Sequence, residues 1–302
     1  MNPFHYKAYG LTIQADFQIE GLVSSESSDT PDVKINLAKL DVSDYPLIKG
    51  FLVREITLEG FLYGIKDLAS FLITDGKTIL VDPLSDEKDK WQMYLLGSVM
   101  GALLQQRGFL TLHGSAVLVD NKAHLILGPS GMGKSSIAMA LQQSGCPFLT
   151  DDICAIKFDE EDTPQLHYGS RLIKLWQDAI DQLDVAQKNM PSVRNGLPKY
   201  RLLLDEVSGN STYTLGHIFI LHFESLKQGH IALEKLNPIK AMSFLNHNVY
   251  RKYFIKQFRL EKSIFSMLSK LTNYAPATLL SRTHAQTDVK EVAKRITDFL
   301  RQ

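Results

Sequence analysis

The chain has 302 residues, enough for one large domain or two modest ones with a buried core. Lysine plus arginine and aspartate plus glutamate number 33 each, and this balance gives no reason to expect a nucleic-acid partner or an anionic membrane surface. The longest apolar stretch, residues 95–104, is far shorter than a membrane span, and the N-terminus lacks a signal-peptide core, so we expect a soluble, cytoplasmic protein.

The first part of the chain, residues 1–85, has the composition of a β-rich region. Its clearest signal is a hairpin, in which Asp75-Gly76 separates the apolar runs 71–74 and 77–81. The serine-rich stretch 24–31 predicts an exposed loop. From about residue 87 to 107, apolar side chains recur at three- and four-residue spacing, which predicts an amphipathic helix whose aromatic residues belong to the core.

A second hairpin follows, with strands over 115–119 and 123–127. The connection is so short that the two strands must be antiparallel, because a parallel crossover needs a dozen or more residues. Pairing Val119 with Ala123 and counting outward places His113 opposite Pro129. A lone histidine is by default a partly buried, hydrogen-bonded side chain, but this pairing favours contact with a phosphate or a role in proton transfer.

Residues 128–135, Gly-Pro-Ser-Gly-Met-Gly-Lys-Ser, match the pattern G-x-x-x-x-G-K-[ST] at every fixed position. In this pattern glycines let backbone N–H groups surround a phosphate, and the following helix points its positive end at the same anion. The motif stands between a predicted strand and a predicted helix over 136–141, so it indicates a purine nucleoside triphosphate site rather than a glycine-rich turn. The expected contacts come from Gly128, Pro129, Ser130, Gly131, Met132, Gly133, Lys134, Ser135 and Ser136.

Two adjacent carboxylates, Asp151 and Asp152, follow a predicted strand over 147–150 and precede the apolar run 153–156. If that strand returns beside the loop strand by a right-handed crossover, its end lies near the triphosphate, where carboxylates can bind a metal ion and activate a nucleophile. Neighbouring residues of a strand face opposite ways, so both reach the site only if the backbone bends. A turn-forming aspartate pair or a helix N-cap is the alternative.

The remaining elements are strands over 215–223 and 231–236, a helix that Asn237-Pro238 opens and a final amphipathic helix over 288–300. No His or Cys stands at ligand spacing from Cys146 or Cys154, which favours free buried thiols over a disulfide or a metal site. Transition-state charge calls for a cation besides Lys134. The candidates are Arg171, Lys174, Lys199 and Arg201, and we favour Lys199 and Arg201 because a flexible loop there can close over the nucleotide.

Three of these segments together resemble the catalytic C-terminal domain of HPr kinase/phosphorylase, which belongs to the phosphoenolpyruvate carboxykinase superfamily. They are Leu112-His113-Gly114, residues 128–135 and Asp151-Asp152, and the similarity covers about residues 111 to 157. A looser resemblance links the chain to HPr-kinase-like proteins of lasso-peptide and related peptide-modification gene clusters. It rests on Tyr9-Gly10-Leu11, Gln106-Arg107-Gly108 and Leu175-Trp176.

The resemblance implies an α/β (α+β) fold in which residues 86–302 form a P-loop catalytic domain of HPr-kinase type with a mixed β-sheet, behind a smaller β-rich region over 1–85. It also implies transfer of the γ-phosphate of ATP, with Mg²⁺, to a serine or threonine hydroxyl of a peptide or small protein. The family's active-site residues correspond here to His113, Lys134, Ser135, Asp151 and Asp152. We expect Ser135 and, by preference, Asp152 to hold Mg²⁺, and Asp151, alone or with His113, to accept the hydroxyl proton.

The chain departs from the family in two respects. The arginine- and glycine-containing signature that follows the nucleotide core of true HPr kinases is missing, and the N-terminal region differs from theirs. Three alternatives therefore stay open: an HPr-type kinase/phosphorylase, a small-molecule hydroxyl kinase, and a regulatory ATP-binding module that hydrolyses ATP slowly. A homo-oligomer is compatible with each of them.

Overall fold

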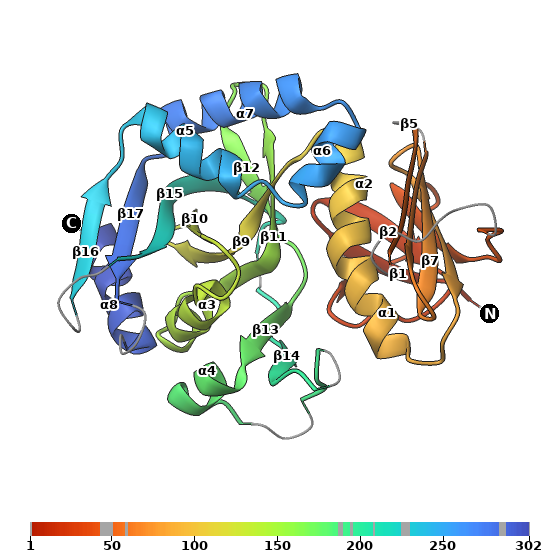
Figure 1. Cartoon of the computed structure of the whole chain (residues 1–302), viewed down its shortest axis with the longest axis horizontal. Helices are drawn as coiled ribbons and strands as arrows, with labels where there is room; N and C mark the ends of the chain where they lie inside the picture. Colours follow the sequence, from red (N-terminus) through yellow and green to blue (C-terminus); the bar gives the residue numbers. More distant parts are fainter. Residues whose placement is uncertain are drawn as a thin grey trace.

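The computed structural model describes residues 2–42, 51–57, 60–186, 190–193, 196–207, 209–224, 230–283 and 288–301. Its first strands form one mixed sheet in the order β3-β1-β2-β4-β8-β7-β6-β5 (Figure 1). The predicted hairpin is confirmed, since Asp75 and Gly76 join β7 and β8 with φ angles of 54° and 58°. The strands are β1 (Phe4–Ala8), β2 (Leu11–Ala15), β3 (Val23–Ser24), β4 (Val33–Leu37), β5 (Phe51–Thr57), β6 (Gly60–Ile65), β7 (Ala69–Thr74) and β8 (Thr78–Pro83).

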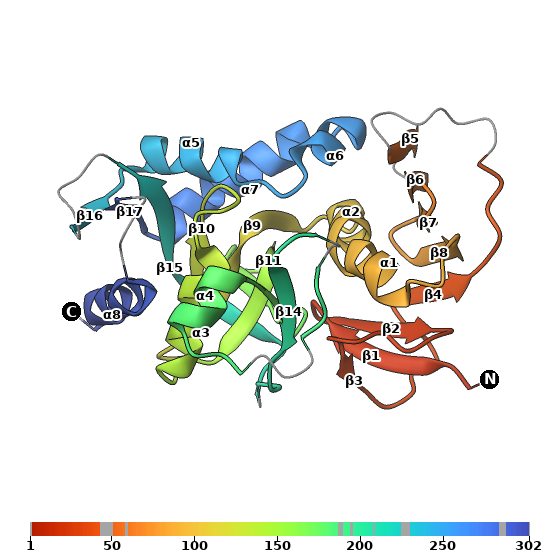
Figure 2. The same cartoon turned by 60° about the horizontal axis from the view of Figure 1, so that its bottom comes forward.

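The predicted helix over 87–107 is confirmed with an irregular centre. Helices α1 (Lys88–Tyr94) and α2 (Met100–Gln106) continue each other through a π-helical turn, η1 (Leu95–Val99). The rod lies between the first sheet and the rest of the chain (Figures 1 and 2), and its apolar side chains share one core with that sheet. Tyr250 and Phe254, from the C-terminal part of the chain, complete this core.

The second sheet positions the phosphate-binding motif. Its strand order is β10-β9-β11-β12-β15-β17-β16, and β10 also pairs with β15. Because β15 pairs with β12 at its start and with β10 further along, the strands β10, β9, β11, β12 and β15 close into a ring. The strands are β9 (Leu110–Val119), β10 (Lys122–Leu127), β11 (Phe148–Phe158), β12 (Pro164–His167), β15 (Thr212–Phe223), β16 (Ile231–Lys235) and β17 (Ala277–Arg282).

Helices cover both faces of this sheet (Figure 1). On one face, α5 (Pro238–His247) and α7 (Glu261–Tyr274) pack with one core cluster, and α6 (Lys252–Gln257) links them to the first sheet. On the other face, α3 (Lys134–Gln143) and α8 (Val289–Leu300) pack with a second cluster. The arrangement is an α+β fold, as predicted. No helix in the described part of the chain is long and apolar enough to span a membrane.

The hairpin register differs from the prediction by one residue. Asp120 and Asn121 both adopt positive φ angles, 48° and 58°, so they form a two-residue turn and Lys122 already pairs with Val119. Leu127 consequently lies opposite Gly114. Two-residue turns with left-handed residues match the twist of the flanking strands, and Asp and Asn tolerate this conformation.

The predicted place of the strand before the aspartate pair was also wrong. It does not lie beside β10, because β9 runs between β10 and β11 and is antiparallel to both. Nor does it end at the pair, since β11 continues through both acids to Phe158. The bend that the prediction required is present, because Asp152 has a φ of 75° within the strand.

The cap of α5 is confirmed and can be tested. The side chain of Asn237 accepts a hydrogen bond of 2.9 Å from the Lys240 N–H, and Pro238 occupies the first helical position. Replacing Asn237 with alanine is expected to lower the free energy of unfolding by about 1 kcal/mol. Urea denaturation checks this value, and Asn237→Asp, which keeps an acceptor oxygen, serves as the control.

Candidate active site

The phosphate loop, residues 128–135, connects β10 to α3. Its glycines Gly128, Gly131 and Gly133 have φ angles of 151°, 84° and 81°, which a residue with a Cβ rarely adopts. Lys134 turns back into the loop, and its Nζ donates to the carbonyl oxygens of Gly128 at 2.8 Å and Pro129 at 3.0 Å. Burial lowers the pKa of Lys134, as expected for a cation that is kept from water until an anion arrives.

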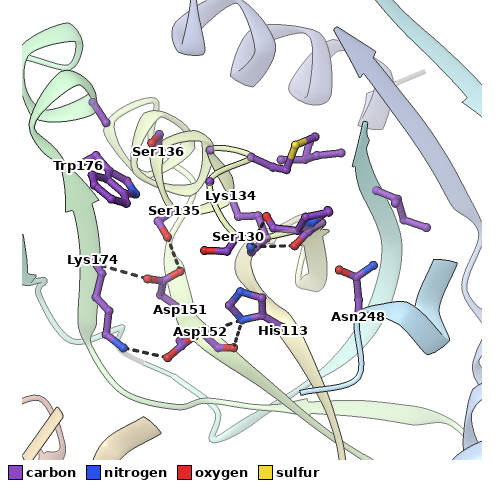
Figure 3. Close-up of a pocket in the computed structure, with 18 of the residues that line it drawn as sticks. His113, Ser130, Lys134, Ser135, Ser136, Asp151, Asp152, Lys174, Trp176 and Asn248 are labelled. Carbon is purple, nitrogen blue, oxygen red and sulfur yellow. Dashed lines mark hydrogen bonds and ion pairs between the residues drawn. The ribbon is translucent and has the colours of Figure 1, made fainter. Parts of the chain in front are cut away.

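A cleft of about 1890 Å³ opens over this loop (Figure 3). Drug-sized ligands typically occupy pockets of roughly 300–1,000 Å³, so the cleft has room for more than a nucleotide. The structure brings His113, Asp151, Asp152 and Lys199 to the lining of this cleft, together with every loop residue that the sequence suggested. Lys174, another of the candidate cations, lines it too, and so do residues that the prediction did not include, among them Asn248, Tyr250 and Arg282.

Asp151 lies against the start of the helix that follows the loop. Its Oδ1 accepts hydrogen bonds from the hydroxyls of Ser115 at 2.7 Å and Ser135 at 2.8 Å, and its Oδ2 accepts one from the backbone N–H of Lys174 at 3.1 Å. The sequence interpretation paired Ser135 with Asp152 as metal ligands. The structure instead places Asp151 in contact with Ser135, because the strand bends after Asp151.

Asp152 faces the other side of the same cleft. Its Oδ2 lies 2.9 Å from Lys174 Nζ, and its Oδ1 lies 3.2 Å from His113 Nδ1 (Figure 3). Burial acts to raise the pKa of Asp152, but the Lys174 ammonium and the hydrogen bond to His113 outweigh it and hold this pKa well below the ordinary value. Asp152 is therefore a carboxylate at neutral pH.

His113 reaches the cleft from β9, as the sequence suggested. Its Nδ1 lies 3.1 Å from the backbone oxygen of Asp152 as well as near the Oδ1 of the same residue. Both neighbours are acceptors, so Nδ1 carries a proton and donates it. In the tautomer with the proton on Nδ1, Nε2 is the proton acceptor of the ring.

The two cations that the sequence favoured, Lys199 and Arg201, lie in different places in the structure. Lys199, on β14 (Lys199–Leu203), lines the cleft with its Nζ 5.5 Å from the ring centre of Trp176. Arg201, on the same strand, forms ion pairs with Asp89 at 2.7 Å and Glu20 at 3.5 Å, against the first sheet and α1. This placement is incompatible with the nucleotide contact that the sequence suggested for Arg201.

Arg282 is a site residue that the sequence interpretation missed. It is the last residue of β17. Strand β17 is parallel to β15, and β15 is parallel to β10, so β17 ends at the same edge of the sheet as β10, where the phosphate loop starts. Its guanidinium donates to the carbonyl oxygen of Met132 at 2.8 Å, and the residue is only 7% exposed. Within the described residues, no carboxylate pairs with it. A basic residue at the end of a parallel strand was the available signal, but the parallel pairing is not visible in the sequence.

The site as described is a phosphate-binding loop faced by two carboxylates, an imidazole and several cations. No protein-family model matches the chain, and no curated protein matches it. Among solved structures, it is similar to the Hpr(Ser) kinase/phosphatase from Coxiella burnetii, with 11% sequence identity and a TM-score of 0.33 over 63% of this chain and 95% of that chain. A similarity of this extent assigns no activity to the chain.

Proposed function

We propose that the protein is a phosphotransferase that moves the γ-phosphate of ATP to a hydroxyl group. The observation that carries this proposal is the arrangement of Asp151 against Ser135 and of Asp152 against His113, both within the cleft of the phosphate loop. Phosphoryl transfer requires mainly that the two reacting oxygens be held in line and that charge on the transferred group be neutralised. The residues of the cleft are suited to both tasks.

Ser135 and Asp151 fit a magnesium ion. They present a hydroxyl and a carboxylate oxygen 2.8 Å apart at the start of α3, and Mg²⁺ prefers such oxygen ligands supplemented by phosphate and water. When bound, the ion would neutralise charge on the β- and γ-phosphates. We therefore assign the carboxylate ligand to Asp151, in place of the Asp152 that the sequence favoured.

His113 and Asp152 fit the role of a proton acceptor and the group that orients it. Asp152 fixes the Nδ1–H tautomer of His113, which leaves Nε2 to take the proton from the acceptor hydroxyl. Lys174 Nζ, at 2.9 Å, keeps Asp152 ionised and so able to stabilise the imidazolium that forms. Lys134 and Lys199 supply positive charge to the same cleft.

The acceptor is inferred to be a serine or threonine of a peptide or small protein. The volume of the cleft supports this inference, because about 1890 Å³ accommodates a chain segment beside the nucleotide. The test incubates purified protein with γ-labelled ATP and Mg²⁺, separately with a serine- and threonine-containing peptide library, with HPr, with small hydroxyl metabolites and with water alone. Labelled peptide is expected. Labelled HPr or a labelled metabolite would show that the acceptor is a protein of that kind or a small molecule, and not a peptide. Release of phosphate to water alone would contradict the proposed kinase activity.

Arg282 is expected to contribute to nucleotide binding, since a buried guanidinium without a carboxylate partner among the described residues favours an anion nearby. Arg282→Met should raise the Kd for ATP by roughly tenfold, the scale of one hydrogen bond to a charged group. Isothermal titration calorimetry measures this change. Arg107→Met is the matched control, because Arg107 also donates to a backbone carbonyl, that of Gly76, but lies outside the cleft. Equal affinities in both variants would exclude Arg282 from the nucleotide site.

A further inference from the structure

The turn between β1 and β2 contacts the second sheet. Tyr9 and Gly10 form it with φ angles of 56° and 71°, and Tyr9 is only 1% exposed. The N–H of Tyr9 donates to the carbonyl oxygen of Tyr168 at 2.7 Å. A Cβ on Gly10 would lie 2.5 Å from Nδ1 of His167, so the turn fits closely against the end of β12. In Figure 2 this end of the first sheet, opposite the N-terminus, points toward the strands of the second sheet.

The hydroxyl of Tyr9 reaches the strand that carries both acids. It lies within hydrogen-bonding reach of the Thr150 side chain and the Ser170 backbone, and the Tyr9 ring packs beside Thr150 over Gly169. Thr150 is fully buried and directly precedes Asp151. Gly169 makes room for this contact, because a Cβ there would lie 2.5 Å from Thr150 Oγ1 and 2.7 Å from Cε1 of Tyr9.

Thr150 in turn bridges the bend in β11. Its Oγ1 donates to the carbonyl oxygen of Ile153 at 3.0 Å, across the two aspartates. Between these ends, Asp152 holds a φ of 75°, a conformation that costs energy for any residue with a Cβ. In a regular strand the two carboxylates would face opposite sides of the sheet. The hydrogen bond from Thr150 to Ile153 therefore spans the bend in β11, and this bend turns both carboxylates toward the cleft.

We propose that Tyr9 is a positioning residue for the aspartate pair. Its hydroxyl fixes the Thr150 side chain in the rotamer that bridges the bend, and the bend keeps Asp151 at Ser135 and Asp152 at His113. The roles of the two acids in this proposal rest on the proposed function. The N-terminal sheet is, on this view, a part of the catalytic machinery, although no residue of it lines the described cleft.

The effect of the Tyr9 hydroxyl can be measured separately from the effect of the packing of its ring. Tyr9→Phe keeps the aromatic ring against Gly169 and removes only the oxygen. Tyr6→Phe is the matched control, because Tyr6 lies in the same sheet, is 4% exposed and accepts a hydrogen bond of 2.8 Å from the Ile19 N–H, which belongs to the N-terminal region and not to the strand of the acids. Each variant loses one buried tyrosine hydroxyl with its partners, so both should lose thermal stability.

In Tyr9→Phe the rate constant for transfer is expected to fall by about ten- to a hundredfold, the cost of a small misplacement at the reacting groups. The Kd for ATP should stay unchanged. Thr150→Val should reproduce this defect and Thr150→Ser should restore the rate. Tyr6→Phe should leave the rate unchanged. Normal transfer in Tyr9→Phe, or equal losses in Tyr9→Phe and Tyr6→Phe, would overturn the proposal.

A second readout does not depend on activity. Nitrogen-15 NMR of the His113 ring, assigned with His113→Gln, reports which ring nitrogen carries the proton. The wild type should show the Nδ1–H tautomer, whereas Tyr9→Phe should show a mixture because Asp152 is no longer held at Nδ1. If the wild type transfers phosphate to no acceptor, the proposed function fails, while the tautomer comparison still decides whether Tyr9 positions the pair. An unchanged tautomer in Tyr9→Phe would overturn the positioning role.

Discussion

Asp152→Asn is expected to slow phosphoryl transfer by about 10²–10⁴-fold, the range measured for general bases and for the carboxylates that orient them, while ATP still binds. Two effects combine. The amide can donate to Nδ1 of His113 and so favours the tautomer with the proton on Nε2, where the acceptor hydroxyl needs a lone pair. Lys174, 2.9 Å from the lost carboxylate oxygen, also remains without its partner. Steady-state kinetics with calorimetric ATP binding separates rate from affinity.

The control for this variant is Asp178→Asn, since Asp178 lines the same cleft but is exposed, and its side chain accepts a hydrogen bond from the neighbouring Ala179 N–H. A rate within about twofold of wild type in Asp152→Asn would remove the His113–Asp152 pair from the mechanism.

Acid denaturation gives an independent check. The folded-state pKa of Asp152 is depressed, so its contribution to stability is complete above the unfolded value of about 3.9 and is lost as the pH falls toward the folded value. Asp152→Asn should lack this component of the acid transition.

Lys134→Ala is expected to impair both steps, with a loss of at least roughly a hundredfold in transfer rate and weaker retention of ATP. In the structure the ammonium donates to the carbonyl oxygens of Gly128 and Pro129, and the phosphates would replace these partners. Calorimetry and single-turnover transfer measure the two losses. Lys122→Ala, an exposed lysine on the strand before the loop, is the control. Full ATP affinity and full transfer in Lys134→Ala would contradict the proposed nucleotide site.

The phosphate loop could be predicted because its requirements are local. Positive φ angles at its glycines, a lysine at a fixed distance and a helix that starts at once are all set by neighbouring residues. The bend at Asp152 was deduced for a similar reason, since two adjacent carboxylates cannot otherwise share one cleft. The hairpin register failed by one residue, because the turn length depends on whether Asp120 and Asn121 both adopt left-handed conformations.

The rest of the site depends on contacts between distant segments. The ion pair of Lys174 with Asp152 and the bond of Arg282 to Met132 join residues 22 and 150 positions apart, and neither spacing has a sequence signature. Arg201 was misplaced for the same reason, because its partners Glu20 and Asp89 come from the N-terminal region. The Tyr9-Gly10-Leu11 segment stood out in the sequence, but only the folded chain shows which side chain it contacts.

The closed ring of strands has a consequence for local opening of the chain. A sheet with free edges can lose an outer strand while its centre stays intact, whereas β9 and β10 are each hydrogen-bonded on both sides. The phosphate loop and His113 are attached to these two strands, and the aspartates to a third member of the ring. Partial unfolding events that release β5 or β3 at the borders of the first sheet can therefore leave the reacting groups aligned.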